Sequence, residues 1–405
     1  MRFYIDMKIF AHSPRTVVLS IAVFFLTVLA AAAAPAKQPG KYLLFVGTYT
    51  EDGSKSKGIY AYTYDATTAQ VTPLGLAAET TNPSWLALAP SGRFLYAVNE
   101  VGNYKGPNSG GVSAFTVDRS SDGRPTGKLT FLNEVSSRGA GPCYISVDRT
   151  GKYVLVANYD GGSVAVFLIR EDGRLGESSA FVQHTGHGTN PERQEAPHAH
   201  SISLSPDNRF AMVDDLGLDE LLVYKFDSAK GSLMPNDPPF AQVDAGSGPR
   251  HFALGKTGKF AYVVSEIKGT VTVFSDDASS GTLHPLQTIS TLPKDFSGAI
   301  EDAEIEVHPS GKFLYVSNRG DANSIAVFAI DPNKGSLTTM EITPTQGKTP
   351  RSFAIDPTGK LLFAANEKSD NIVIFRIDAK TGRLTPTGQS LEISEPVCLK
   401  FLAIP

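Results

Sequence analysis

Nine histidine, arginine and glutamate side chains recur at two positions of an internal repeat, and together they suit chemistry on an anionic small molecule. They are His198, His200, Arg250, His251, Glu266, Glu304, Arg319, Arg351 and Glu367. Arginine can clamp a carboxylate or phosphate through paired hydrogen bonds. Glutamate or histidine can act as general base on a water molecule, and an arginine beside a carbonyl can stabilise a developing oxyanion.

The same side chains could instead serve only as turn caps and as ion pairs between neighbouring repeats. This structural interpretation is weakest for Arg250 and Glu266, because opposite charges at the mouth of a ring are well placed for a ligand. The chain has neither the Gly-x-Ser-x-Gly turn of a serine hydrolase nor the Gly-x-x-x-x-Gly-Lys loop of a nucleotide-binding protein.

A metal site is a third possibility for part of this set. His198 and His200 have the alternate spacing of two ligands, and the candidates that could complete the site are Asp214, Asp215 and Glu304. The signal is weak, because alternate residues of any strand point to the same side. We therefore expect no metal and no cofactor.

The elements that must position these residues belong to a repeat of about fifty residues. Each copy has a basic residue, then aromatic and β-branched residues, then a polar pair. The seven copies begin at Lys41, Arg93, Lys152, Arg209, Lys259, Lys312 and Lys360. They are spaced 52, 59, 57, 50, 53 and 48 residues apart.

Strand-like segments surround each copy and complete a four-stranded unit. A segment that often opens with proline, such as 142–147, precedes the copy, and an alternating segment, such as 163–167, follows it. The first copy lacks the preceding segment, whereas 396–401 is such a segment with no copy after it. The sequence therefore predicts an all-β, seven-bladed β-propeller closed by the C-terminal strand, since closure leaves no unpaired edge.

Alignment of the repeats places the nine side chains on one face of the ring. Most lie at the start of a blade's first strand or at the end of its second strand, and these two points are neighbours in an antiparallel pair. Three long insertions could form walls above this face: 103–110, 184–197 and 292–300. We expect His251, Glu304, Arg351 and Glu367 to bind substrate there.

The first 36 residues have the order of a secretory signal. Lys8 and Arg15 precede an apolar run over 17–34, and small residues follow it. We expect residues 1–36 to be a signal peptide, residues 37–405 to form the propeller, and the protein to be periplasmic or extracellular, with no stable membrane span after cleavage. The alternative is a retained membrane anchor, because the run is long enough to cross a bilayer.

Charge and cysteine content restrict the partners and the cross-links. The net charge is −4 with no basic run, which argues against a nucleic-acid partner. The two cysteines, Cys143 and Cys398, fall two blades apart in adjacent repeat positions that face opposite ways. We therefore expect them to be buried and unpaired rather than joined in a disulfide.

From residue 42 to 401 the chain resembles the propeller-type 6-phosphogluconolactonases, whose relatives include the carboxy-cis,cis-muconate cyclases. The resemblance rests on short stretches that begin at Gly47, Tyr96, Val156, Pro197, Gly248, Ser317 and Pro396. It implies a seven-bladed propeller without a metal and with a site of histidine, arginine and glutamate on one face. Carried onto this sequence, the catalytic residues would be His198 or His200, Arg250, Glu266 and Arg319.

Three functions remain open at this point. The first is hydrolysis of a sugar lactone, with Arg250 and Arg319 holding an anionic substrate and Glu266 or His200 activating water. The second is cycloisomerisation of a carboxymuconate by the same groups. The third is a non-enzymatic, exported binding scaffold, because a fold does not fix a function. A signal peptide also argues against a phosphorylated cytosolic substrate.

Overall fold

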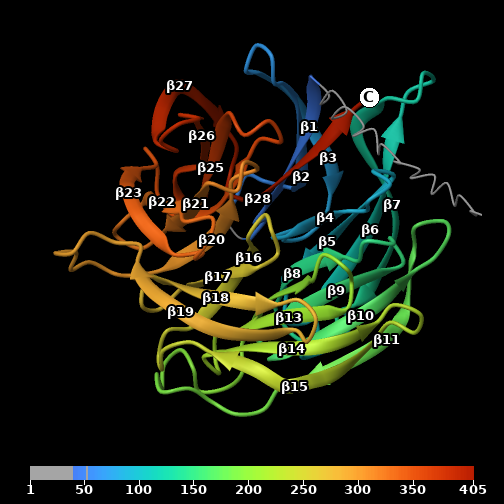
Figure 1. The fold of residues 1–405 in the computed structure, drawn as a ribbon. Coiled ribbons are helices and arrows are strands. Elements are labelled where there is room, and N and C mark those ends of the chain that lie inside the picture. The colour runs from blue at the N-terminus through green and yellow to red at the C-terminus, as the bar shows by residue number, and fades with distance from the viewer. Residues whose placement is uncertain (1–39, 52) are drawn as a thin grey trace, which may run out of the picture. The chain divides into compact units, whose positions relative to one another are not determined.

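The computed structural model describes residues 40–51 and 53–405. The predicted signal peptide, residues 1–36, lies outside the described residues. The described chain forms seven four-stranded antiparallel sheets, which confirms the predicted seven-bladed β-propeller (Figure 1). The one helix in this part of the chain, the 3-10 helix η1 (Glu367–Ser369), is too short to cross a membrane.

Six blades follow the chain in order, each starting from its innermost strand. Blade 2 contains β4 (Leu86–Leu88), β5 (Phe94–Asn99), β6 (Gly111–Arg119) and β7 (Pro125–Ser136). Blade 3 contains β8 (Pro142–Val147), β9 (Tyr153–Asn158), β10 (Ser163–Ile169) and β11 (Leu175–Gln183). Blade 4 contains β12 (Ala199–Leu204), β13 (Phe210–Asp215), β14 (Glu220–Asp227) and β15 (Ser232–Gln242).

Blade 5 contains β16 (Pro249–Leu254), β17 (Phe260–Ser265), β18 (Thr270–Asp277) and β19 (Thr282–Ser290). Blade 6 contains β20 (Asp302–Val307), β21 (Phe313–Asn318), β22 (Ser324–Ile330) and β23 (Leu337–Pro344). Blade 7 contains β24 (Pro350–Ile355), β25 (Leu361–Asn366), β26 (Asn371–Ile377) and β27 (Leu384–Glu392).

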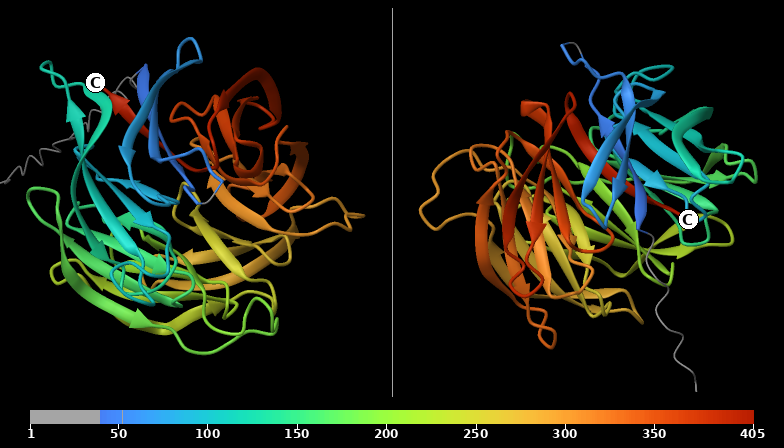
Figure 2. Two further views of the ribbon diagram at one scale, coloured as in Figure 1. Left: turned by 180° about the vertical axis from the view of Figure 1, so that it is seen from behind. Right: turned by 90° about the horizontal axis from the view of Figure 1, so that it is seen from above.

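Blade 1 joins the two ends of the propeller. It contains β28 (Pro396–Ile404), β1 (Lys41–Thr48), β2 (Gly58–Asp65) and β3 (Gln70–Glu79). The last strand pairs antiparallel with the first, with Lys41 opposite Ile404 and Gly47 opposite Cys398. The red β28 lies beside the blue β1 in Figures 1 and 2. The predicted closure by the C-terminal strand is therefore confirmed.

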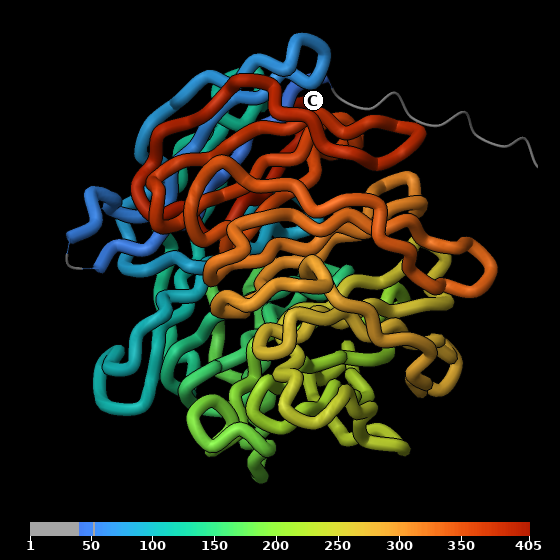
Figure 3. The backbone as a smooth tube through the Cα atoms, turned by 90° about the vertical axis from the view of Figure 1, so that its left-hand side faces the viewer, coloured from blue at the N-terminus to red at the C-terminus, as the bar shows by residue number. Residues whose placement is uncertain are grey.

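Hydrophobic packing between blades explains why the second strands are mostly apolar and almost completely buried. In β5, β9 and β25 every residue is buried, because each blade is covered on both faces by its neighbours. The outermost strands, such as β15 and β27, have mostly exposed or half-buried residues. Figure 3 shows the colours following one another through the tube, as expected when the order of blades follows the order of the chain.

The innermost strands form a ring around the axis of the propeller. β4, β8, β12, β16, β20, β24 and β28 each contact the next strand in this series, and β28 contacts β4. Cys143 on β8 and Cys398 on β28 are buried and free, as expected from their repeat positions. The start of each innermost strand lies beside the end of its blade's second strand, so these points from all seven blades gather at one end of the axis. We call this end the axial mouth.

Candidate active site at the axial mouth

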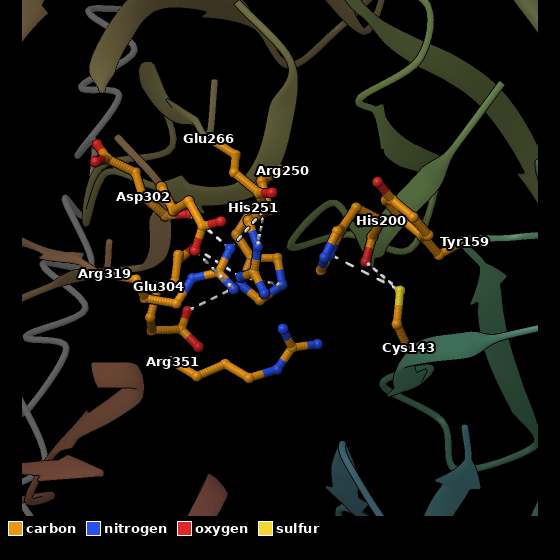
Figure 4. Close-up of polar contacts among 12 residues, drawn as sticks. Cys143, Tyr159, His200, Arg250, His251, Glu266, Asp302, Glu304, Arg319 and Arg351 are labelled. Atoms are coloured by element: carbon orange, nitrogen blue, oxygen red, sulfur yellow. Dashed lines mark hydrogen bonds and ion pairs between the residues drawn. The ribbon is translucent and has the colours of Figure 1, made fainter. Parts of the chain in front are cut away.

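Arg250, Glu266 and Arg319 converge at the axial mouth, although they come from three separate strands. Arg250 is the second residue of β16, and Glu266 and Arg319 directly follow β17 and β21. The Oε2 atom of Glu266 lies 2.8 Å from Arg250 Nε and 2.8 Å from Arg319 Nη2 (Figure 4). The sequence had placed all three residues on one face of the ring, and the structure brings them into direct contact.

A third arginine, which sequence reasoning missed, completes this cluster. Arg193 forms an ion pair with Oε1 of Glu266 and donates a hydrogen bond of 3.3 Å to the Tyr159 hydroxyl. It belongs to the long insertion 184–197, whose length was the only sequence signal for it. The insertion is anchored by the buried Gln194, which donates to the Leu216 carbonyl oxygen at 2.8 Å and to Asp219 Oδ1 at 2.7 Å.

The three arginines make Glu266 a strongly held carboxylate. Burial alone would raise the pKa of Glu266, but Arg319, Arg250 and Arg193 outweigh burial and lower that pKa to about 2. Both carboxylate oxygens are already hydrogen bonded, so they have little capacity left to take a proton from water. Glu266 is therefore better suited to holding the arginines in place than to acting as a general base.

Arg250 is fixed by backbone as well as by Glu266. Its Nη1 donates to the carbonyl oxygen of Ala303 at 2.9 Å, whereas no described residue accepts a hydrogen bond from its Nη2. Burial, together with the positive charges of Arg319 and Arg351, lowers the pKa of Arg250 to about 10. The side chain remains a cation at neutral pH with one unused nitrogen.

The two histidines of the Pro-His-Ala-His stretch have different surroundings. His200 lies between the arginines and Tyr159, with its ring centroid 5.1 Å from that of His251 (Figure 4). Its Nδ1 lies 3.8 Å from Cys143 Sγ, and no described residue hydrogen bonds its Nε2. Burial and the nearby Arg250 hold the pKa of His200 well below its usual value, so the imidazole is neutral.

His198 supports the wall of the site instead. Its ring stacks on Tyr159 with centroids 4.6 Å apart, and its Nδ1 lies 3.1 Å from the Tyr159 carbonyl oxygen. Its Nε2 faces Glu195 at 3.3 Å, close to solvent. Of the two histidines, His200 is thus the one whose free nitrogen neighbours the arginine cluster.

His251 and Glu304 form a floor below the arginines. His251 Nδ1 lies 3.3 Å from Glu304 Oε1, and its ring packs edge-on against Trp85 and Tyr144. Burial lowers the pKa of His251 to about 4, although Glu304 opposes this. His251 also contacts the cluster directly, because its Nε2 lies 3.4 Å from Arg250 Nη1.

Arg351 approaches the same space from the other side of the axial mouth (Figure 4). It lies on β24, with its guanidinium 5.3 Å from the centre of the Tyr49 ring and its Nη2 3.8 Å from Glu100 Oε2. Its side chain makes no hydrogen bond to any described residue. Glu367, at the start of η1, forms an ion pair of 2.8 Å with Lys368 at the edge of this region.

The acids considered for a metal site are engaged elsewhere. Asp214 accepts a hydrogen bond from Ser201, and Asp215 pairs with His184 at 2.6 Å. Within residues 40–51 and 53–405, no group of three or more histidine, cysteine or acidic side chains is arranged to hold a metal ion. Glu304, the third acid considered, pairs with His251 at 3.3 Å.

The other two long insertions contribute less directly. In 103–110, Tyr104 donates a hydrogen bond to the Glu134 carbonyl oxygen of its own blade. In 292–300, the Ala299 amide donates to Asp321, in the turn that follows Arg319. Among the three expected walls, only 184–197 brings a side chain into the described contacts of Glu266.

Comparison with known proteins gives consistent matches over almost the whole propeller. Residues 43–401 match the family model described as "Lactonase, 7-bladed beta-propeller". The chain is 37% identical to a 6-phosphogluconolactonase of Bacillus subtilis, over 89% of this chain and 99% of that protein. It is 33% identical to a 6-phosphogluconolactonase of Formosa agariphila, over 87% and 97% of the two chains. A solved structure, the periplasmic gluconolactonase of Pseudomonas aeruginosa, shares 37% identity with a TM-score of 0.83, covering 90% of this chain and all of that one (100%).

Proposed function

Because this chain belongs to the seven-bladed β-propeller lactonase family and is a lactone hydrolase, we infer that it opens a sugar lactone at the axial mouth. The observation that carries this proposal is the cluster around Glu266. Three guanidinium groups contact one buried carboxylate, and a neutral histidine with a free nitrogen lies beside them. Such a site can stabilise negative charge that develops on a carbonyl oxygen while a base deprotonates water.

We assign the role of general base to His200 rather than to Glu266. Its imidazole is neutral, and its Nε2 is not engaged by described residues, whereas both oxygens of Glu266 are bound by arginine. In the first step, a water oxygen bonds to the lactone carbonyl carbon and its proton moves to His200 Nε2. Arg250 Nη2 donates to the carbonyl oxygen, where negative charge develops.

The second step breaks the ring. The bond from the carbonyl carbon to the ring oxygen cleaves, and the ring oxygen takes the proton from His200 as it leaves. The product is a hydroxy acid, which loses its acidic proton to solvent, so one water molecule is consumed and His200 returns to its neutral form. Glu266 acts in both steps as a positioning residue that holds the arginines.

The remaining arginines suit substrate binding. Arg193 has a side chain that is 36% exposed, and Arg319 Nη1 lies 3.9 Å from Glu301 Oε2. These two groups can hold an anionic substituent such as a phosphate, if the substrate carries one. The Arg351 guanidinium, which has no hydrogen-bond acceptor among the described residues, can reach the substrate from the opposite side.

We also propose that the protein is exported and that the propeller domain is residues 37–405. The charged, apolar and small-residue order of residues 1–36 supports this. The word "periplasmic" in the description of the Pseudomonas aeruginosa structure is consistent with the proposal. Cell fractionation of the native chain, with N-terminal sequencing of the product, tests both the location and the cleavage site.

A lactone panel tests the proposed activity. Purified protein comprising residues 37–405 is assayed with gluconolactone, with its 6-phosphate and with a carboxymuconate, and the uncatalysed rate is subtracted. Ring opening that exceeds the background, and that falls in Arg250→Ala and His200→Gln variants, supports the proposal. Turnover of the muconate alone would favour cycloisomerisation, and no turnover of any compound would favour a binding scaffold.

A further inference from the structure

A second polar group lies on the side of the axial mouth away from Glu266. It consists of the Tyr49, Glu100 and Arg351 side chains, and the proposed mechanism uses only Arg351. Tyr49 follows β1 of blade 1, Glu100 follows β5 of blade 2, and Arg351 is on β24 of blade 7. These blades are consecutive in the ring, whereas Arg250 and Glu266 belong to blade 5 and Arg319 to blade 6. The mouth thus has two chemically different sides.

The hydrogen-bonding capacity of this group is only partly used. Tyr49 donates a hydrogen bond of 3.0 Å to Glu100 Oε2. Arg351 Nη2 is 3.8 Å from the same oxygen, which is too far for a direct hydrogen bond. No described residue donates to Glu100 Oε1, and none accepts from the Arg351 guanidinium. The Glu100 and Arg351 side chains retain 22% and 15% of their exposure, so a ligand in the mouth can reach them.

The group is held in place by the backbone rather than by its own contacts. The Glu100 amide donates to the Asn82 carbonyl oxygen at 3.0 Å, and the Asn82 side-chain nitrogen donates to the Glu100 carbonyl oxygen at 3.2 Å. The side-chain oxygen of Asn82 accepts from the Thr50 amide at 2.8 Å, next to Tyr49. Asn82 is buried, so the two segments that carry Tyr49 and Glu100 are fixed relative to each other.

The chemistry of the group matches a hydroxyl. A carboxylate only accepts hydrogen bonds and a guanidinium only donates them, whereas a hydroxyl does both. A hydroxyl group lying between Glu100 and Arg351 can donate to the first and accept from the second. A carboxylate or phosphate in the same place would be repelled by Glu100. A muconate, which has carboxylates and no hydroxyl, therefore fits this side poorly.

We propose that Glu100, together with Arg351 and Tyr49, is a subsite that binds hydroxyl groups of the substrate and selects a polyhydroxylated lactone. This rests on the proposed function and deepens it by assigning recognition of the sugar's hydroxyl groups to these residues. Glu100 and Tyr49 act on specificity, and the bond-breaking steps take place on the other side of the mouth. A site built to bond a hydroxyl discriminates strongly against an analogue that lacks it, because its polar groups are then left unpaired.

The test compares two six-membered lactones, gluconolactone and δ-valerolactone, of which only the first has ring hydroxyls. For Glu100→Gln we expect kcat/KM for gluconolactone to fall about 10- to 100-fold, as for loss of a charged hydrogen bond. The kcat/KM for δ-valerolactone should change less than about threefold, because this lactone has no ring hydroxyl to lose a hydrogen bond. Tyr49→Phe keeps the carboxylate and should cause a smaller fall that is also confined to gluconolactone.

A matched control is Glu395→Gln. Glu395 is another glutamate at this edge with a similarly exposed side chain, 21%, and it pairs with Lys368. We expect it to leave both substrates unchanged. An equal loss on both lactones in Glu100→Gln, or a loss on neither, would overturn the subsite while leaving the proposed function intact.

A binding measurement keeps the subsite testable without catalysis. 1,5-Anhydroglucitol has the hydroxylated ring and no carbonyl, and tetrahydropyran has the ring alone. Ligand-observed NMR should detect the first on the unmodified protein, lose it on Glu100→Gln, and detect the second on neither. If no lactone is opened but this pattern holds, the proposed function fails and the subsite stands. If the anhydroglucitol signal is the same on the unmodified protein and on the variant, the subsite is wrong. The thermal unfolding midpoint of each variant shows whether its folding is unchanged.

Discussion

Arg250 Nε lies 2.8 Å from Glu266 Oε2, and both side chains are almost completely buried. A buried ion pair of this kind is expensive to desolvate, and it is tolerated when further hydrogen bonds satisfy both groups. Here the carboxylate also contacts Arg193 and Arg319, so one negative charge faces three positive charges. The result is a locally cationic region that is rigid before any substrate arrives.

The first prediction concerns stability. Glu266→Gln removes the carboxylate that all three arginines share, and breaking a buried pair from one side typically costs about 3–5 kcal/mol. We expect a loss of this size in the free energy of unfolding, measured by urea denaturation at neutral pH. Glu301→Gln, which removes a half-exposed partner 3.9 Å from Arg319, should cost less than about 1 kcal/mol. Equal effects of the two variants would contradict a central role for Glu266.

The second prediction separates the two histidines. His200→Gln should lower kcat for gluconolactone about 100- to 10,000-fold with little change in KM, as for loss of a general base. His198→Gln removes the ring that stacks on Tyr159 and its contacts with the Tyr159 carbonyl oxygen and Glu195, but no general base. It should lower kcat less than about tenfold, below the range for loss of a general base. Steady-state kinetics on both variants decides the assignment, and the reverse order of effects would transfer the base role to His198.

The third prediction concerns Arg193. Its side chain is the most exposed of the three that contact Glu266, so it can meet a substituent that extends out of the mouth. Arg193→Ala should reduce kcat/KM for the 6-phosphate of gluconolactone about tenfold more than for gluconolactone itself, the scale of one charged hydrogen bond. A uniform reduction for both substrates would show that Arg193 only supports Glu266.

The fourth prediction is a pH dependence of stability that arises outside the site. Burial raises the pKa of Asp214 from 3.8 to about 7, against the opposing hydrogen bond from Ser201, and its Oδ1 has no partner within the described chain. A carboxyl group whose pKa is raised by folding binds more protons in the folded state, so its cost grows as pH rises from about 4 to about 7.

Asp214→Asn removes this titration. The variant should therefore gain stability relative to the unmodified protein as pH is raised from about 5 to about 8. Urea midpoints at the two pH values measure the difference. Asp207→Asn is the control, because hydrogen bonds from Ser205 and Arg209 outweigh burial and lower the pKa of Asp207 to about 2. Its difference from the unmodified protein should stay constant over this range, and a constant difference for Asp214→Asn as well would refute the assignment.

The repeat made the fold and part of the site predictable. Each copy encodes one buried second strand, and the unmatched segment at the C-terminus could pair only with the first blade, as β28 does. Arg250, Glu266 and Arg319 were predicted to meet because equivalent positions of successive blades must lie around one axis. Glu100 occupies the same repeat position as Glu266. The alignment therefore placed Glu100 at the axial mouth, although it was not among the candidate site residues.

The contact of Arg193 could not be predicted in the same way. It lies in an insertion without periodicity, and its position depends on the anchoring of Gln194 to Asp219 in the following blade. The separate roles of His198 and His200 were also hidden in the sequence. They follow from contacts with other blades, because His198 stacks on Tyr159 whereas His200 lies against Cys143 and His251.

The pairing of β28 with β1 has a consequence for biosynthesis. β28, which closes the first blade, follows every other strand of the propeller in the chain, so a nascent chain has an incomplete first blade until β28 has been synthesised. Tyr49 follows β1 on one side of that seam, and Arg351 lies on β24, which packs beside β28 on the other side, so the two can be brought together durably only when β28 is in place. A tag or truncation at the C-terminus would therefore disturb ligand selection at the mouth, although no residue there had been altered.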